Sequence, residues 1–286
     1  DLLDRVTDPR ERDLPGLSPA DYGLEANVRL TEAAARSWEH AKAYWGAFKA
    51  RLESSRPGAE LGVTRQQWLL PLLAELGYDD LDYRAQAEEI NGRPFHISHR
   101  ATSEAPAPPL HLVAASQPLD KTDASASGVK ASPHGYLQSY LNETDHVWGI
   151  VSNGRQLRIL RDNASLTRPA YLEFDLEGMM EGGVFSDFTL LWLVAHRTRL
   201  PKGTTDAASC LLEKWSEAAQ VRGSRVQKEL RGRVRLAINA LGQGFLDHPE
   251  NEQLRARLAD GSLDAADYYR QILRMVYRML FLLVAE

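Results

Sequence analysis

The sequence predicts an α+β protein, with a mixed α/β region in the middle, a helical arm before it and an all-helical segment after it. Three observations carry this prediction. Near both ends of the chain, apolar residues recur at spacings of three and four, which is typical of helices. Between them lie short apolar runs bounded by turn residues, which is typical of strands. Two Asn-Gly pairs, at residues 91–92 and 153–154, each predict a β-hairpin. We expect three parts, spanning residues 1–62, 63–200 and 201–286.

The first part is expected to be an arm followed by one long helix. Residues 1–22 contain three prolines among charged residues, which predicts an extended segment. Residues 26–52 carry apolar side chains at helical spacing. Beyond a break at residues 54–62, Thr64 is expected to cap a short helix over residues 65–76, which ends at Gly77.

The middle of the chain is expected to be built mainly of strands. The elements predicted there, in order, are a hairpin of residues 81–90 and 93–100, a strand at 110–115, a polar loop at 118–132, a helix at 134–142, a hairpin of 147–151 and 156–160, and a strand at 171–176. From residue 185 onward the pattern is helical, with breaks near 201–205, 223, 247–249 and 261–262.

This order of elements matches the core of the PD-(D/E)xK nuclease fold, whose site places an acid on one strand and Glu/Asp-x-Lys on the next to hold Mg²⁺. The strand at residues 110–116 contains neither a carboxylate nor a lysine, and residues 95–99 contain no acid. Asp79, Asp80, Asp82 and Asp120 lie outside the required spacing. We therefore predict a degenerate nuclease-like domain without catalytic residues. An active Mg²⁺-dependent endonuclease that draws its acids from other positions is the alternative.

Two further clusters are compatible with metal binding. His96 and His99 are three residues apart, so on one strand they would point to opposite faces. Glu173, Asp175 and Glu177 share one face of a strand, but such alternation is also what a half-buried edge strand shows. We expect ordinary packing or surface positions for both clusters, and hence no metal ligands.

The strongest local concentration of charge lies at residues 221–235, where six basic residues accompany a single acid, although the whole chain carries a net charge of −5. If one helix runs through Gly223 and Gly232, five of these residues share a face, opposite an apolar stripe that includes Val226, Leu230, Val234, Ala237, Leu241 and Phe245. A basic stripe of this kind can contact DNA phosphates. A solvated face is the alternative. The predicted DNA-binding residues are Arg222, Arg225, Lys228, Arg231 and Arg235.

Other chemistry is excluded by what the sequence lacks. It contains no G-x-S-x-G, Walker or H-E-x-x-H motif, and no Asn-Pro-Pro-Tyr motif for holding an extruded adenine. Cys210 is the only cysteine, which suits a reducing cytoplasm. The longest strongly apolar run, residues 279–284, is too short to span a membrane. We predict a cytoplasmic protein without catalytic, cofactor-binding or metal-binding residues of its own.

Several runs together resemble the front region of large adenine-specific DNA methyltransferases, those of type IIG restriction enzymes and of the BREX and DISARM phage-defence systems. They are residues 64–78 (TRQQWLLPLLAELGY), 97–99, 133–134, 140–142, 148–154 (WGIVSNG), 157–162, 166–168, 171–176, 185–188 and 268–278 (YYRQILRMVYR). The resemblance spans about residues 12–286. In that family the methyltransferase motifs follow a leucine-rich helical stretch like the one at which this sequence stops.

The resemblance implies a piece of a longer protein whose cofactor is S-adenosylmethionine and whose substrate is double-stranded DNA. It favours a DNA-engaging module that does not itself catalyse methyl transfer. Because the nuclease-like strand lacks acids, it also favours defence methyltransferases that modify DNA without cutting it. The alternatives are a platform that docks other defence subunits without touching DNA, and the active endonuclease described above.

Overall fold

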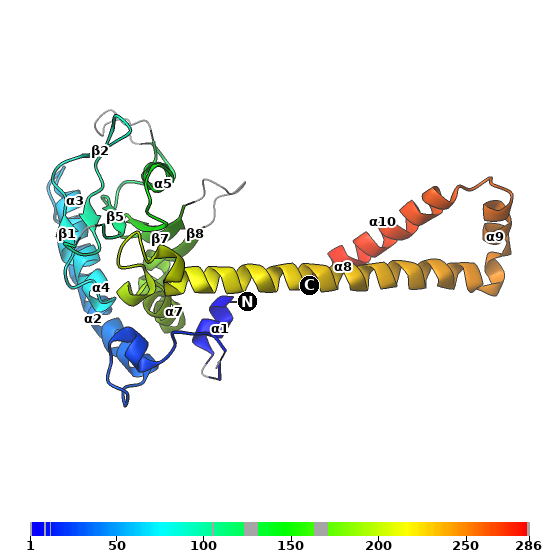
Figure 1. Cartoon of the computed structure of the whole chain (residues 1–286), viewed down its shortest axis with the longest axis horizontal. Helices are drawn as coiled ribbons and strands as arrows, with labels where there is room; N and C mark the ends of the chain where they lie inside the picture. The colour runs from blue at the N-terminus through cyan, green and yellow to red at the C-terminus, as the bar shows by residue number, and fades with distance from the viewer. Residues whose placement is uncertain are drawn as a thin grey trace. The chain divides into compact units, whose positions relative to one another are not determined.

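The computed structural model describes residues 2–8, 10–11, 13–104, 106–122, 131–162 and 171–284 (Figure 1). Within these ranges, the side chains of residues 2, 222–227, 283 and 284 lie outside the description. The chain divides into two compact units, Asp1–Glu217 and Ala218–Glu286. No helix of the described residues is long and apolar enough to cross a membrane.

The first unit is built around a mixed six-stranded sheet. Its strands lie in the order β1 (Asp82–Tyr83), β4 (His99–Arg100), β5 (Pro109–Leu112), β6 (Trp148–Ser152), β7 (Gln156–Arg161) and β8 (Tyr171–Asp175). Among the strands of the described residues, only β5 and β6 pair in parallel, and helix α5 (Pro133–Glu143) lies between them in the chain. A parallel pair needs such a crossover, because the chain must return to the same end of the sheet before the next strand can begin.

Apolar side chains fill both faces of the sheet. On one face, Ile150 and Ile159 belong to a large core that includes residues of α2 (Leu30–Glu53), α4 (Leu70–Glu75) and α7 (Phe185–Ala195). On the other face, Val151 and Leu160 pack with residues of α5. The alternation along β6 and β7 thus assigns successive residues to different cores, as the two-residue period of a strand requires.

The helical predictions for the front of the chain are confirmed in outline. α2 matches the helix expected at residues 26–52. The helix expected at residues 65–76 is longer, since α3 (Glu60–Val63), the π-helical segment η2 (Thr64–Leu69) and α4 follow one another without a break. The prediction that Thr64 caps this helix is wrong, because Thr64 lies inside it and its hydroxyl donates to the carbonyl of Glu60.

The extended arm predicted at residues 1–22 is also wrong. The segment forms a short helix, α1 (Leu2–Thr7), and a turn, η1 (Pro19–Tyr22), and it buries Val6, Leu14 and Tyr22. Arg199, in the turn η3 (Arg197–Arg199), donates to the backbone carbonyls of Gly16 and Asp21, and its guanidinium lies 3.9 Å from the centroid of the Tyr22 ring. The prolines and charges of residues 1–22 could not indicate these contacts, because their partner, Arg199, is far away in the sequence.

The first predicted hairpin divides between two sheets. β2 (Glu88–Ile90) and β3 (Arg93–Phe95) form a separate two-stranded sheet, whose turn has the positive φ angles of 51° at Asn91 and 75° at Gly92. The turn is therefore as the Asn-Gly pair predicts. β1 and β4, from the outer ends of the same segment, pair with each other in the main sheet instead.

The remaining strand and helix predictions of the first unit agree well with the structure. α5 and the β6–β7 hairpin lie where expected, and β8 is the edge strand of the sheet. β5 ends at Leu112 rather than at residue 115. Helix α6 (Leu176–Gly182) follows β8 directly, and the turn η4 (Ala207–Ser209) lies after the expected break at 201–205. Part of the predicted loop at 118–132, residues 123–130, lies outside the description.

The second unit contains most of α8 (Leu211–Asp247), from Ala218 onward, and the turn η5 (Pro249–Asn251), α9 (Glu252–Ala259) and α10 (Ala265–Val284). The break expected at Gly223 is absent, since α8 is continuous there. Ile238 of α8 packs with Ile272 and Val276 of α10, and the Tyr268 hydroxyl donates to the carbonyl of Gly242 at 2.7 Å.

The predicted apolar stripe of α8 is only partly right. Val234, Leu241 and Phe245 pack against the small core of the second unit. Leu230 and Ala237 are exposed, whereas Ile238, which was not predicted, is buried. Which positions of α8 are buried depends on where α10 packs against it, and helical spacing alone does not show this.

Candidate nucleic-acid interface

The described residues of β4 and β5, where the sequence analysis looked for catalytic acids, contain no Asp or Glu. Beside β5, the Ser98 hydroxyl donates to the carbonyl of Leu110 and accepts from the backbone N–H of Leu112. The Arg65 guanidinium donates to the carbonyl of Leu112, with an Nε–O distance of 3.0 Å. The side chains that contact the backbone of β5 here are therefore a hydroxyl and a guanidinium, whereas Mg²⁺ is usually held by carboxylates.

The aspartates that precede this region have other partners. The Asp80 carboxylate accepts hydrogen bonds from the backbone and hydroxyl of Ser103. Asp82 forms an ion pair with Arg84, with an N–O distance of 3.0 Å. Among the residues that the structure describes, no group of three or more His, Cys, Asp or Glu side chains is placed to hold a metal ion.

The two histidines considered in the sequence analysis, His96 and His99, differ in burial. His96 is exposed and lies outside the strands, in the segment between β3 and β4. His99 is buried, its Nδ1 lies 2.9 Å from the Ser98 hydroxyl, and burial lowers its pKa to about 4. His99 is therefore neutral at pH 7.

The prediction that Glu173, Asp175 and Glu177 share one strand face is wrong for Glu177, because β8 ends at Asp175 and Glu177 belongs to α6. Glu173 pairs with Arg158, and Glu177 pairs with Arg155. Asp175 caps α6 by accepting a hydrogen bond from the backbone N–H of Gly178. Each of the three acids therefore has a protein partner, two in ion pairs and one as the N-cap of α6.

The basic stripe lies on a continuous helix. α8 runs through both Gly223 and Gly232, which is the condition under which the predicted residues share a face. Lys228, Arg231 and Arg235 are exposed, and the ion pairs and hydrogen bonds among the described residues include none of their side chains. Arg233 is exposed in the same turns of the helix. The side chains of Arg222 and Arg225 lie outside the described residues.

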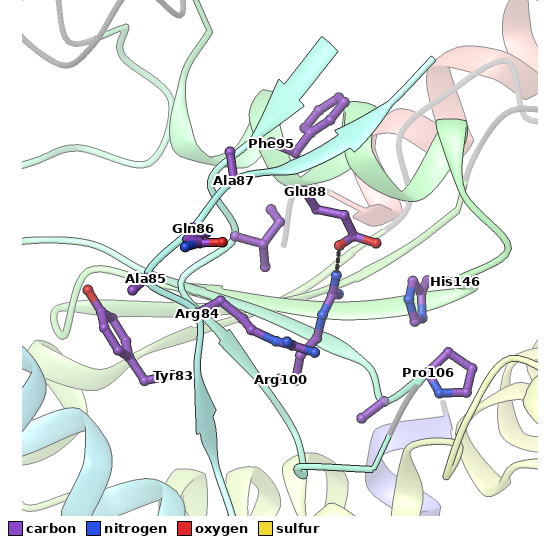
Figure 2. Close-up of a pocket in the computed structure, with 12 residues that line it drawn as sticks. Tyr83, Arg84, Ala85, Gln86, Ala87, Glu88, Phe95, Arg100, Pro106 and His146 are labelled. Carbon is purple, nitrogen blue, oxygen red and sulfur yellow. Dashed lines mark hydrogen bonds and ion pairs between the residues drawn. The ribbon is translucent and has the colours of Figure 1, made fainter. Parts of the chain in front are cut away.

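Sequence reasoning did not identify the cavity shown in Figure 2. It has a volume of about 570 Å³ and lies in the first unit, between the 83–88 segment and the residues around β3 and β4. Its lining includes Glu88, Phe95, Arg100 and His146. These residues share no sequence motif, and they meet only because the 81–100 segment divides between two sheets.

The centre of the polar wall is Arg100, whose side chain is 7% exposed. Its Nη2 pairs with the Glu88 carboxylate and donates to the Tyr140 hydroxyl, which in turn donates to Glu88 at 2.9 Å. Figure 2 shows the Glu88 carboxylate turned toward Arg100. His146 stacks on the Tyr140 ring, and burial lowers its pKa to about 4, so it is neutral at pH 7.

Searches of protein-family profiles, of curated proteins and of solved structures found no match to this chain.

Proposed function

We propose that this chain is a non-catalytic DNA-engaging module, and that it forms the front part of a bacterial adenine-specific DNA methyltransferase of a restriction or phage-defence system. The observation that carries the DNA-binding part is the exposed face of α8, where Lys228, Arg231 and Arg235 have no acidic partner among the described residues. Unpaired surface cations on one helix face are suited to a phosphate backbone.

The topology of the first unit supports a nuclease-like origin. β1, β4 and β5 form an antiparallel meander, α5 crosses over, and β6 pairs in parallel with β5. This is the order that the sequence predicted for a PD-(D/E)xK core. Because Ser98 and Arg65 occupy the region where acids are required, the domain is proposed to position DNA rather than cut it.

The proposed contacts act by releasing counterions from DNA, since each cation that meets a phosphate displaces the ions condensed there. Such contacts hold the duplex without reading its sequence. Methyl transfer and the S-adenosylmethionine that it consumes are assigned to the methyltransferase part of the parent protein. No residue of this chain is assigned to the cofactor.

The test is a double charge reversal, Lys228→Glu with Arg231→Glu, measured by fluorescence anisotropy on a labelled duplex at several salt concentrations. We expect binding to weaken by more than about tenfold, and the slope of log affinity against log salt to fall by about two, because two phosphate contacts are lost. The loss should be similar for duplexes of unrelated sequence.

The matched control is Arg51→Glu with Arg56→Glu, which makes the same change in net charge at exposed positions near the end of α2. The control should leave both affinity and salt slope nearly unchanged. If the α8 reversal behaves like this control while circular dichroism shows an intact helix, the stripe is a solvated surface and the proposal is wrong.

A protein-docking platform is the second candidate, and the surface of α10 favours it. Tyr277, Phe281 and Leu282 are exposed to 71%, 67% and 68%. Clustered exposed apolar side chains are typical of surfaces that meet another protein surface. Two results together would favour this function. The Lys228→Glu, Arg231→Glu protein would bind DNA normally, and a defence subunit that binds the parent protein would not bind the Tyr277→Ser, Phe281→Ser protein.

A further inference from the structure

One donor of Arg100, a residue that lines the cavity in Figure 2, has no acceptor among the described residues. Arg100 Nη1 is buried and makes no hydrogen bond with any described residue, although Nη2 of the same guanidinium is fully engaged. Buried polar groups in folded proteins almost always have a partner, so an orphaned guanidinium nitrogen indicates an acceptor supplied from outside.

The cavity also presents an acceptor, on the Glu88 carboxylate that pairs with Arg100. Glu88 uses Oε2 for Arg100 and Tyr140, while its Oε1 accepts no hydrogen bond from the described residues. Because Glu88 also compensates the charge of Arg100, the pair attracts a neutral ligand with complementary polar groups rather than a phosphate or carboxylate. The matching ligand edge has an acceptor adjacent to an N–H.

The remaining lining of the cavity is largely apolar and aromatic, which suits a planar ring of a ligand. Phe95 and Ile97 are buried apolar residues, Tyr83 is an exposed aromatic residue, and all three line the cavity with Pro106 and Ala107. The volume of about 570 Å³ falls within the range of small-molecule sites. Apolar walls with a few placed polar groups are the usual composition of such sites.

We propose that this cavity binds a nucleobase, with Arg100 Nη1 donating to a ring nitrogen or carbonyl oxygen of the base and Glu88 Oε1 accepting from the neighbouring N–H. Every nucleobase has such an edge. The choice of a nucleobase among planar heterocycles rests on the proposed DNA-engaging function, whereas the need for a paired donor and acceptor follows from Arg100 and Glu88.

The first experiment titrates the four nucleosides into ¹⁵N-labelled protein and follows the amide signals by NMR. At least one nucleoside should bind with a dissociation constant in the millimolar range or tighter. The signals that move should belong to residues 83–88, Arg100 and His146. Absence of saturable binding by all four nucleosides, or movement confined to another region, would overturn the proposal.

The diagnostic variant is Arg100→Lys, which keeps a positive charge beside Glu88 but removes the planar Nη1 donor. Binding should weaken by at least about tenfold. The matched control is Arg93→Lys, because Arg93, on β3, is exposed, pairs with Glu143 and does not line the cavity. Equal affinity in both variants would show that Arg100 does not hold the ligand. Should Arg100→Lys fail to fold, the NMR mapping of the unaltered protein decides.

The source of the base is tested with a duplex that contains 2-aminopurine, whose fluorescence rises when it leaves the base stack. A rise that requires Arg100 identifies a base extruded from DNA, whereas nucleoside binding without any rise identifies a free nucleoside or nucleotide. The Lys228→Glu, Arg231→Glu protein should bind nucleosides normally. Its DNA binding and nucleoside binding therefore report separately on the proposed function and on this cavity.

Discussion

Gly154 occupies a position that a larger residue fits poorly. It has a φ of +80°, and a Cβ atom there would lie 2.9 Å from Thr64 Cγ2 and 3.0 Å from Trp68 Cδ1. Its carbonyl also accepts a hydrogen bond of 2.7 Å from the Trp68 indole. The turn of the β6–β7 hairpin is thus packed directly against the π-helical segment, and only glycine fits both the φ angle and the space.

We predict that Gly154→Ala lowers the free energy of unfolding by about 2–4 kcal/mol, because the left-handed φ and the steric clash both oppose a methyl group. The control is Gly58→Ala, where φ is +87° but no atom lies within 4 Å of the added Cβ. It should cost about 1 kcal/mol, from backbone strain alone. Urea unfolding measures both, and equal losses would contradict the assigned role of the packing.

Buried histidines make stability depend on pH. The pKa of His99 is lowered to about 4, first by burial and then by the nearby charge of Arg65. His196 is lowered to about 4 in the same way, by burial and Arg199. The unfolded chain takes up these protons below its ordinary histidine pKa of about 6.5, whereas the folded chain does not until about pH 4. Stability therefore falls as the pH falls through that window.

For His99 this effect reaches up to about 3 kcal/mol between pH 7 and pH 4. We predict that urea midpoints of the parent protein decrease from pH 7 to pH 5, and that His99→Gln makes the decrease shallower. The exposed His96 is the control, and His96→Gln should retain the slope of the parent. A His99→Gln protein with the slope of the parent would show that this histidine does not contribute.

At the scale of elements, the π-helical segment joins the helical layer to the sheet. Thr64 is completely buried, and its hydroxyl donates to the Glu60 carbonyl at 2.7 Å and accepts from the backbone N–H of Ala115 at 3.1 Å. One hydroxyl thus satisfies a donor just beyond the end of β5. π-Helical turns are rare and occur mostly as single turns inside α-helices.

Thr64→Val keeps the shape of this side chain but leaves the buried N–H of Ala115 without an acceptor. We predict a loss of about 1–3 kcal/mol in the free energy of unfolding. Thr64→Ser, which retains the oxygen and loses one methyl group, should lose about 1 kcal/mol. If the serine variant proves less stable than the valine variant, the methyl packing matters more than the hydrogen bond.

At the scale of the whole molecule, the sheet topology and its chemistry diverge. The strand order and the α5 crossover are as the sequence predicted, and the side chains of Ser98 and Arg65, rather than acids, contact the backbone of β5. We predict that supercoiled plasmid remains intact after incubation with this protein and Mg²⁺ or Mn²⁺. Cleavage that disappears in Asp79→Ala, Asp80→Ala or Asp82→Ala protein would instead identify an active endonuclease.

The sequence by itself determined the elements whose causes are local. Helical spacing located α2 and α5, and the two Asn-Gly pairs located the turns of both hairpins. The absence of acids and lysine from residues 110–116 was likewise evident from the sequence alone. Such features depend on a few neighbouring residues, so they can be predicted without knowing the distant contacts of the chain. The DNA-binding stripe stays a prediction, although the continuity of α8 that it required is present.

The tertiary structure decided everything that depends on distant partners. It divided the 81–100 segment between two sheets, folded residues 1–22 against Arg199, and buried Ile238 of α8 beneath α10. It also brought Glu88, Arg100 and His146 to one cavity. Each of these outcomes follows from competition among long-range contacts for the same apolar and hydrogen-bonding surface, and local spacing carries no information about which partner prevails.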